Sequence, residues 1–283
     1  MNIGVTTPLP AHTVDPAFTA KKAEELGFES IWYAEHPILP VNSPNTIFPG
    51  AADGIIPVGY RHFTDPFIAL SRASAVTTHL KLGTGITLMP ERNPLVLAKT
   101  IAALDLYSGG RFEFGIGAGW HREETEMMGG DFDHRWTQSK EAVLAMKELW
   151  TKDEAEFHGK YFDFPPVYCY PKPAQDPHPP VLLGGMAKNV FRRVVSWADG
   201  WLPNRVSPED VKAGREMLNT LAAEKERDAS SITISVHGQP ADYDLAQKLL
   251  EAGANRVIIA IQPSNTEQEM GDELERIASI VLR

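Results

Sequence analysis

The 283-residue sequence has a single cysteine, Cys169, so no disulfide can form within the chain. No apolar run approaches the roughly 20 residues that a membrane-spanning helix needs. No basic amphipathic stretch indicates attachment to a membrane surface, and the first residues lack the basic and then apolar pattern of a signal peptide. We therefore predict a cytoplasmic protein with no membrane role.

Positive charge is also scarce, with 27 Lys and Arg against 37 Asp and Glu and a net charge of −10. Nucleic-acid binding needs clustered cations, so a small-molecule partner fits better. The sequence contains no phosphate-binding Walker loop, no nucleophile elbow and no His, Cys or carboxylate pairs at metal-ligand spacing on one helix, so we predict no metal site. Lysine is absent from the carboxyl ends of the predicted strands, which disfavours a Schiff-base aldolase.

Hydrophobic residues make up 43% of the chain and charged residues 23%, as in a folded protein with a substantial core. Short β-rich runs alternate with longer helical patterns, which is typical of repeated βα units. We predict an α/β fold, a single (β/α)8 TIM-barrel domain over residues 1–283. The predicted strands are 2–6, 30–34, 80–87, 111–117, 181–183, 200–202, 232–237 and 256–261. The predicted helices are 15–26, 66–77, 94–107, 134–152, 187–198, 208–227, 241–252 and 267–282.

Two segments interrupt this alternation. Residues 37–65 carry too many helix breakers for a helix or a central strand, namely Pro37, Pro40, Pro44, Pro49, Gly50, Gly54, Pro57 and Gly59. We predict a flexible substrate-covering loop there, with a packed surface excursion as the alternative. Residues 152–180 are predicted to form a hairpin from 154–158 and 161–164, followed by extended coil over residues 165–180.

Two glycine motifs follow predicted strands. In the first, FGIGAGW at residues 114–120, glycines allow a flat ring or an anion to approach the backbone closely. One alternative is a dinucleotide-binding fingerprint, but the last glycine of that fingerprint is missing here. The other alternative is purely structural: the glycines are needed only for tight turns. The second motif, VLLGGMAK at residues 181–188, places Gly184 and Gly185 before a predicted helix, where free amides favour a phosphate. Taken alone, this pattern is as often a plain turn.

A histidine, His36, follows the predicted strand SIWYA, directly after Glu35. Functional groups of a barrel lie at the carboxyl ends of its strands, and histidine can exchange a proton near neutral pH. His36 is therefore the candidate catalytic residue. The alternative is a turn residue before Pro37.

Four segments together resemble the bacterial-luciferase-like monooxygenase superfamily over nearly the whole chain. They are AEELGFESIWYAEH at 23–36, DPFIALSRASAVTTHLKLGTGI at 65–86, RNPLVLAKTIAALDLYSGGRFEFGIGAGWHREE at 92–124 and PPVLLGGMAKNVFRRVVSWADGWLP at 179–203. The resemblance implies a parallel barrel with a flavin or deazaflavin ring at the carboxyl ends of its strands. It also implies a homodimer.

The same resemblance implies the binding residues. His36 matches a histidine beside the reactive ring, and Gly85 and Ile86 match a bulge behind the ring, where deazaflavin members carry a non-prolyl cis peptide. Gly184, Gly185 and Met186 match amides that hold the cofactor phosphate. The full predicted cofactor-binding set is Thr84, Gly85, Ile86, Gly117, Ala118, Gly119, Trp120, Gly184, Gly185, Met186 and Ala187.

The GIGAGW and RNPLVLAK segments resemble the subgroup of oxidoreductases that depend on coenzyme F420, a deazaflavin. Ala118 stands where sugar-phosphate-oxidising members carry an acid, so that substrate is disfavoured. The resemblance therefore implies hydride transfer between coenzyme F420 and a small organic substrate. One alternative is a two-component monooxygenase that uses oxygen and reduced FMN from a separate reductase, and another is a non-catalytic binding protein.

Overall fold

The structure, a computed structural model, describes residues 1–48 and 53–283. Two of the predicted breakers, Pro49 and Gly50, lie outside these residues. Across the part of the chain that is described, no helix is long and apolar enough to cross a membrane.

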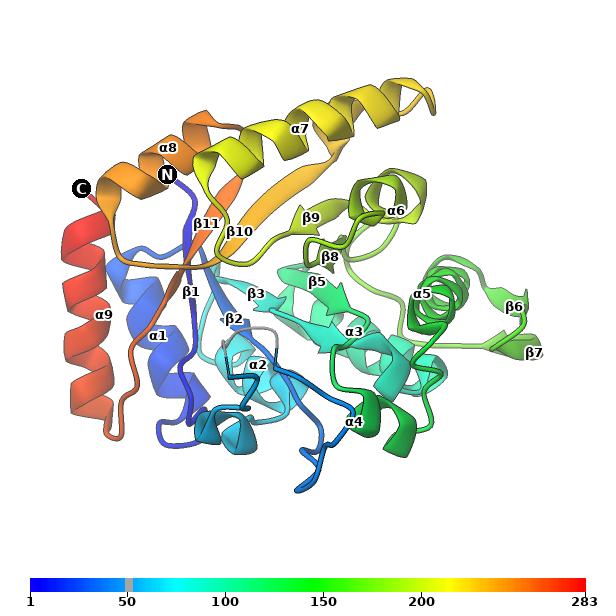
Figure 1. Ribbon diagram of the computed structural model, residues 1–283, viewed down its shortest axis with the longest axis horizontal. Coiled ribbons are helices and arrows are strands. Elements are labelled where there is room, and N and C mark those ends of the chain that lie inside the picture. The colour runs from blue at the N-terminus through cyan, green and yellow to red at the C-terminus, as the bar shows by residue number, and fades with distance from the viewer. Residues whose placement is uncertain (49–52) are drawn as a thin grey trace.

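The strands form a closed parallel barrel (Figure 1). Its eighth and first strands pair with each other, and the third position is shared by two short strands, β3 and β4, that both pair with β5. The predicted TIM barrel is confirmed. The barrel strands are β1 (Ile3–Thr6), β2 (Ser30–Tyr33), β3 (Lys81–Thr84), β4 (Thr87–Leu88), β5 (Phe112–Gly117), β8 (Val181–Gly184), β9 (Gly200–Leu202), β10 (Thr233–Gln239) and β11 (Arg256–Ala260).

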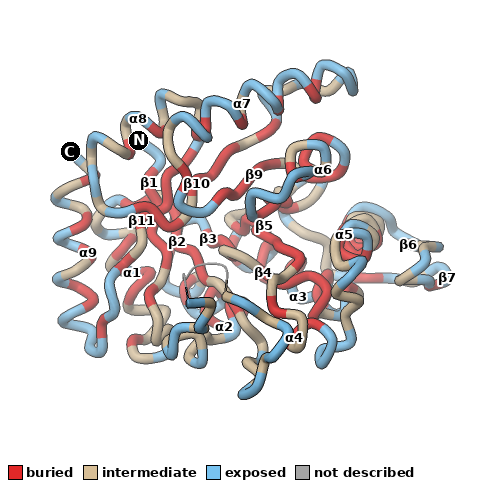
Figure 2. The backbone as a smooth tube through the Cα atoms, in the orientation of Figure 1, coloured by how far each residue is buried: buried red, intermediate tan, exposed pale blue. Residues whose placement is uncertain are grey.

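Helices surround the barrel, and buried residues follow the strands and the inward faces of these helices (Figure 2). The α-helices are α1 (Pro16–Leu26), α2 (Pro66–Ser74), α3 (Pro94–Ser108), α4 (Arg122–Met127), α5 (Arg135–Thr151), α6 (Val190–Trp197), α7 (Pro208–Ala223), α8 (Tyr243–Glu251) and α9 (Glu267–Val281). Short 3-10 helices are η1 (Val58–His62), η2 (Met89–Glu91) and η3 (Ala229–Ser231).

Four helices begin with the same capping motif, a polar N-cap residue followed by proline. The capping residues are Asp15 before α1, Asp65 before α2, Asn93 before α3 and Ser207 before α7. Each side chain accepts a hydrogen bond from a first-turn N–H, and the following proline needs no such partner. The sequence therefore specifies where these helices start, at about 1 kcal/mol for each cap.

Several predicted boundaries were wrong, and α2 and α7 end three and four residues earlier than predicted. Helix α6 begins at Val190 rather than at residue 187, so residues 185–189 form a loop. The predicted coil over residues 165–180 begins too early, because Pro165 and Pro166 belong to β7 (Asp163–Tyr168), which pairs with β6 (Glu154–His158). Two-stranded sheets have only edge strands, where the missing N–H of proline is tolerated. The predicted strand over residues 80–87 breaks at Gly85 and Ile86.

The barrel interior is filled by a small apolar cluster of Trp32, Leu182, Leu202 and Ile258, with Ile86 packed against it. Trp32 leaves no room for a side chain at Gly83, where an added Cβ would lie 2.2 Å from its ring. An ion cluster closes the amino ends of the strands. There Arg256 donates to Glu29 and to Glu113, at 2.6 and 2.7 Å, beneath the Trp32 ring.

Candidate functional site

The break between β3 and β4 shapes the carboxyl end of the barrel at Gly85 and Ile86. The peptide bond that joins these residues is cis. An added Cβ at Gly85 would lie 2.7 Å from Nε2 of His237, so a side chain there would displace the His237 ring. Both residues are half-buried, whereas Thr84 is fully buried and donates its hydroxyl to the Gly115 carbonyl at 2.7 Å. Contact between these residues and a cofactor remains a prediction.

The second predicted group follows β5. Gly117 is buried, and an added Cβ would lie 2.0 Å from Cδ1 of Ile86, so this glycine allows the β3–β4 break to pack against β5. Ala118 is 3% exposed. Gly119 has φ 78°, which turns the chain so that Trp120 lies 5.3 Å from the His36 ring, measured between centroids. Of this group, Trp120 is therefore the residue that the structure brings to His36.

The third group, Gly184 to Ala187, lies at the end of β8 and in the loop before α6. The prediction placed these amides at a helix N-terminus, but the late start of α6 makes them loop amides. Gly185 has φ 92° and open space around its Cα. Its carbonyl accepts a hydrogen bond from Nε1 of Trp201 at 2.9 Å, so the N–H of Met186 points the opposite way. No described residue accepts a hydrogen bond from the N–H of Gly185, Met186 or Ala187.

His36 lies just beyond β2, where a buried carboxyl holds its ring. Its Nδ1 is 2.5 Å from Oε2 of Glu124, and the two side chains are 5% and 0% exposed. Aromatic rings of Tyr60, Phe63 and Trp120 surround it at centroid distances of 5.5, 5.2 and 5.3 Å. Burial lowers the pKa of His36 to about 4, although the charge of Glu35 opposes this change. His36 is thus a neutral, largely buried ring near pH 7.

A second histidine, His121, supports this arrangement from the N-terminus of α4. Its Nδ1 accepts the backbone N–H of Glu124 at 3.1 Å, so the ring proton is on Nε2 and is donated to Oγ of Ser43 at 2.9 Å. Burial lowers the pKa of His121, consistent with a neutral ring. His121 thereby fixes the backbone of Glu124 and attaches the segment after His36 to α4.

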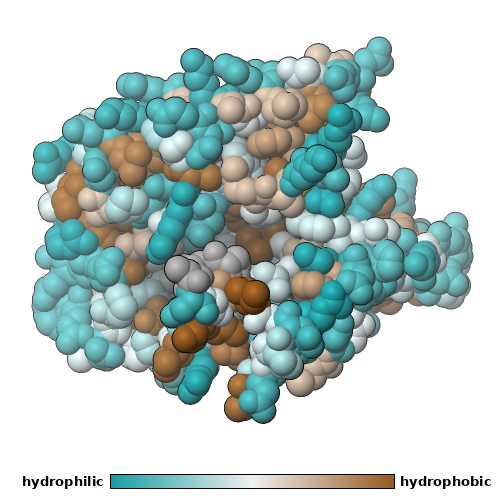
Figure 3. All heavy atoms as spheres, viewed as in Figure 1, coloured by the Kyte–Doolittle hydropathy of each residue, from teal (hydrophilic) through white to brown (hydrophobic). Residues whose placement is uncertain are grey.

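Residues 37–65 lie across this region in their described parts. Thr46 bonds Glu123 and accepts the N–H of Arg122, while Phe48 packs 5.2 Å from Trp120. Several apolar side chains of this segment are exposed, at 97% for Val41 and 78% for Ile47. Figure 3 shows hydrophobic surface gathered in the lower middle of the view, where Figure 1 places this segment. Its role as a cover over substrate remains a prediction.

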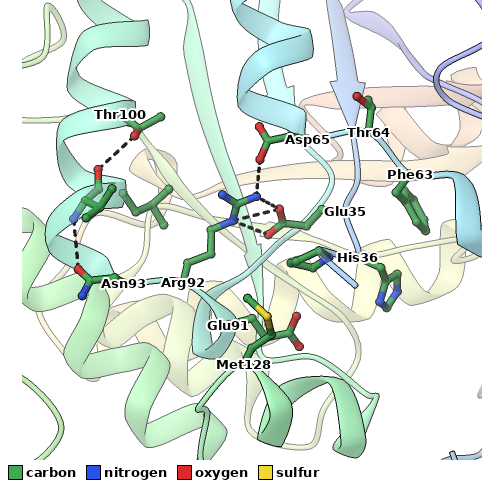
Figure 4. Close-up of a pocket in the computed structure, with 13 residues that line it drawn as sticks. Glu35, His36, Phe63, Thr64, Asp65, Glu91, Arg92, Asn93, Thr100 and Met128 are labelled. Carbon is green, nitrogen blue, oxygen red and sulfur yellow. Dashed lines mark hydrogen bonds and ion pairs between the residues drawn. The ribbon is translucent and has the colours of Figure 1, made fainter. Parts of the chain in front are cut away.

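A cavity of about 420 Å³ lies beside His36 (Figure 4). Among the predicted site residues, His36 alone lines it. Charged groups on its wall are Glu91 and the ion pair of Glu35 with Arg92, which also bonds Asp65 at 2.9 Å. Glu35 accepts the N–H of Leu88 at 2.8 Å as well, so it fixes β4 rather than facing the barrel mouth.

Sequence reasoning missed several polar residues of the site. Glu124 and His121 lie in or beside α4, which is not among the helices predicted above, and Glu91 lies between two predicted elements. His237 was placed only at the end of a strand, although its Nε2 is buried beside Gly85 with no partner among the described residues. Arg193 in the first turn of α6 also has a buried Nη1 without a described partner.

These features fit a flat anionic cofactor. Free loop amides and the unpaired Nη1 of Arg193 are groups that bind a phosphate. Burial and the nearby charge of Arg135 lower the pKa of Arg193, a repulsion that an anion would relieve. A flat ring would find a buried donor or acceptor in His237 Nε2, next to Gly85.

Comparisons with known proteins agree with this geometry. Over 271 residues the chain is 34% identical to an uncharacterized protein of Mycobacterium tuberculosis, covering 94% of this chain and 93% of that one. Over 137 residues it is 33% identical to an FMNH(2)-dependent dimethylsulfone monooxygenase of Pseudomonas putida, covering 46% of this chain and 37% of the relative.

The fold is similar to that of an F420-dependent secondary alcohol dehydrogenase solved with an F420-acetone adduct. The TM-score is 0.77 at 18% identity, with 99% of this chain and 98% of the other covered. The family model described as luciferase-like monooxygenase matches residues 16–277. The chain therefore belongs to the luciferase-like monooxygenase family, whose members include flavin-dependent and F420-dependent oxidoreductases.

Proposed function

We propose that this protein is an oxidoreductase that transfers a hydride between coenzyme F420 and a carbon of a small organic substrate. The observation that carries the proposal is His36, a neutral histidine at the carboxyl end of β2 with Nδ1 held by buried Glu124. Interconversion of an alcohol and a carbonyl moves a hydride and a proton together, and a held neutral imidazole is suited to the proton. The GIGAGW and RNPLVLAK segments support the choice of F420.

The residues of the chain divide this work. F420 supplies a carbon that accepts or gives the hydride, as cofactors supply the difficult chemistry in such enzymes. Gly185, Met186 and Ala187 would offer their amides to the cofactor phosphate, and Arg193 in the first turn of α6 is a candidate cation for it. His36 exchanges the substrate proton through Nε2, since Nδ1 is bonded to Glu124.

The surroundings of His36 favour a substrate with an apolar carbon skeleton and one oxygen. Rings of Phe48, Tyr60, Phe63 and Trp120 come together there, at centroid distances from 5.0 to 6.3 Å. A polar skeleton would lose its hydration among these rings without gaining partners. The apolar side chains of residues 37–65 would then cover such a substrate and exclude water.

A second candidate is a monooxygenase that takes reduced FMN from a separate reductase and inserts oxygen. The similarity to the dimethylsulfone monooxygenase favours it, because that match extends over 46% of this chain at 33% identity. His36 would handle a proton in either reaction, so the site geometry alone does not separate the two.

Turnover assays with both cofactors test the proposal. The purified protein is supplied either with F420 and a panel of small secondary alcohols, or with reduced F420 and the matching ketones and enones. We expect a change in F420 absorbance that needs both protein and substrate. Oxygen consumption and an oxygenated product with reduced FMN, together with no turnover of F420, would instead establish the monooxygenase. Turnover with either cofactor excludes a non-catalytic binding protein.

A further inference from the structure

Two buried carboxyls lie behind His36. Glu124, in the first turn of α4, contacts Nδ1 of His36. Glu91, in η2, is 3% exposed, and its Oε1 accepts a hydrogen bond from the Thr125 hydroxyl at 2.9 Å. Because Thr125 directly follows Glu124 in α4, this bond brings Glu91 close to Glu124, and the charge of Glu124 is among the causes that raise the pKa of Glu91.

No cation of the described chain neutralises this pair. Arg92 is adjacent to Glu91 in sequence, but its guanidinium bonds Glu35 and Asp65 instead (Figure 4). Oε2 of Glu91 and Oε1 of Glu124 are buried, and no described residue bonds them. Two carboxylates in such a place cannot both be charged, because burial and mutual repulsion each favour the neutral form. The pair therefore holds at least one proton near neutral pH.

Burial is the largest cause of this preference. It raises the pKa of Glu91 to about 9, with a further contribution from Glu124. It also raises the pKa of Glu124 to about 8, against a backbone hydrogen bond from Ile38. The described residues contain no group of three or more His, Cys, Asp or Glu side chains arranged to hold a metal, so a metal site does not account for the pair.

The proton on Glu124 determines what His36 can do. When Glu124 is protonated, its hydroxyl donates to Nδ1, and the neutral ring then carries its hydrogen on Nε2. When Glu124 is a carboxylate, Nδ1–H donates to it and Nε2 becomes a free acceptor. Nε2 is thus a proton donor in one state and a proton acceptor in the other, at a fixed ring position.

We propose that Glu124 and Glu91 are a proton store that sets the protonation of His36 and connects it to the cavity beside Glu91. This inference rests on the proposed function of His36. In oxidation of an alcohol, the O–H proton would pass to Nε2 and the Nδ1 proton to Glu124, while the C–H bond of the alcohol carbon would break and its hydride would go to the bound cofactor, which leaves a carbonyl. Carbonyl reduction reverses each transfer.

The cavity supplies the path to solvent. It has a volume of about 420 Å³ and is lined by both His36 and Glu91, so a proton can leave without passing the substrate. The other titratable groups facing the pair are Glu35 with its partners Arg92 and Asp65, and His121 with Glu123 from α4. Glu35 is held by a cation, and His121 by hydrogen bonds that fix its neutral form.

Infrared spectroscopy of the cofactor-free protein tests the store directly. With glutamate labelled by ¹³C at its side-chain carboxyl, we expect the stretching band of a protonated carboxyl at pH 7, well above the ordinary pKa of 4.5. Glu124→Gln and Glu91→Gln should each change or remove this band. Glu126→Gln is the control, because Glu126 is on α4 but exposed. Absence of the band from the wild-type protein at pH 7 would overturn the proposal, as would a band unaffected by both variants.

Nitrogen NMR of His36 provides a second readout. In the wild-type protein we expect the ring hydrogen to move from Nε2 to Nδ1 between about pH 6 and about pH 10, on either side of the value of about 8 for Glu124. In Glu124→Gln, the amide does not titrate in this range, so the ring hydrogen should stay on the same nitrogen throughout. One tautomer throughout this range in the wild-type protein contradicts the switch, and so does an unchanged transition in Glu124→Gln.

Turnover separates this inference from the proposed function. If His36→Ala is inactive while Glu124→Gln keeps the wild-type activity and pH profile, the store is wrong and the role of His36 stands. If His36→Ala is fully active, the proposed role of His36 is wrong whatever the spectra show.

Discussion

At the level of single residues, His36 bears most of the proposed chemistry. His36→Ala should lower kcat/KM by about 10²–10⁴, the usual effect of losing a general acid or base. The dissociation constant of the cofactor should stay nearly the same. His79→Ala is the control, since the His79 side chain is 73% exposed. A loss below about tenfold would indicate orientation of substrate rather than proton transfer. Full activity with a lowered melting temperature would show that His36 is only a turn residue.

The burial of the Glu91 carboxyl leads to a separate prediction about the pH dependence of stability. Its pKa is raised from 4.5 to about 9, so the folded protein keeps a proton that the unfolded chain releases. The free energy of unfolding should therefore fall as pH rises from about 4.5 towards about 9. Glutamine does not titrate, so Glu91→Gln should not show this fall. The free energy of unfolding of the variant, relative to wild type, should therefore rise by at least about 1.4 kcal/mol between about pH 5 and about pH 8.5. Urea unfolding of both proteins at these two pH values measures the change. The same difference in free energy of unfolding at both pH values would contradict the prediction.

Sequence reasoning found His36 but not its partner. His36 follows an apolar strand, and that position alone indicates the barrel mouth. Glu124 is 88 positions away and looked like an ordinary acidic residue in a helix start. Only the closed barrel brings α4 against the end of β2. A buried residue can be expected from a pattern, but its partner across the fold cannot.

Among the structural elements, the loop between β8 and α6 carries the predicted phosphate site. Replacing Gly185 changes this loop by one methyl group but also strains a backbone with φ 92°. Gly129 offers a matched control, because its φ is 86° and both glycines have open space around them. Gly185→Ala and Gly129→Ala should thus cost similar stability, about 1 kcal/mol.

The two variants should differ in cofactor binding. Gly185→Ala should weaken binding by about 1–3 kcal/mol, because the methyl group blocks at least one charge-assisted hydrogen bond from the loop. Gly129→Ala should bind as the wild-type protein does. Fluorescence titration of each variant measures the difference. Equal affinities would refute the placement of the phosphate at this loop.

Element boundaries were predictable where local chemistry specifies them. Helices α1, α2, α3 and α7 each start at a polar cap followed by proline, and their predicted starts agree to within one residue. The start of α6 was missed, because Asn189 caps without a side-chain hydrogen bond and no proline follows. The break after β3 falls at Gly85 and Ile86, where the family resemblance implied a bulge, but the approach of His237 to Gly85 joins distant strands and could not be read from the sequence.

For the whole molecule, the ion cluster at the amino ends of the strands should support stability without touching the cofactor. Burial alone would raise the pKa of Glu113, but Arg256 and Lys81 lower it. A carboxyl whose pKa is lower in the folded protein than in the unfolded chain stabilises the fold at pH values above its unfolded pKa. This stability is lost as the pH falls through its folded pKa. Glu113→Gln should therefore lower the free energy of unfolding by about 3–5 kcal/mol at pH 7, and by less in acid.

A surface ion pair gives the comparison. Glu275→Gln removes a pair with Lys22 in which Glu275 is 56% exposed, and should cost at most about 1 kcal/mol. Neither variant should change cofactor affinity. Equal losses in the two variants would show that the buried cluster contributes no more than a surface contact.

The barrel itself was predictable from eight alternations of strand and helix, because closure needs only their number and order. Cofactor identity was not, since the chain is similar both to an FMNH(2)-dependent relative and to a solved F420-dependent structure. The two cofactors differ at the reacting ring atom, and that atom determines whether hydride transfer or oxygen activation follows.

Parallel binding titrations with F420 and FMN, followed by absorbance and fluorescence, test the proposed function most directly. We expect F420 to bind with a dissociation constant at least tenfold below that of FMN, a difference of about 1.4 kcal/mol. Equal or tighter binding of FMN, with oxygen consumed when reduced FMN is supplied, would contradict the assignment to F420.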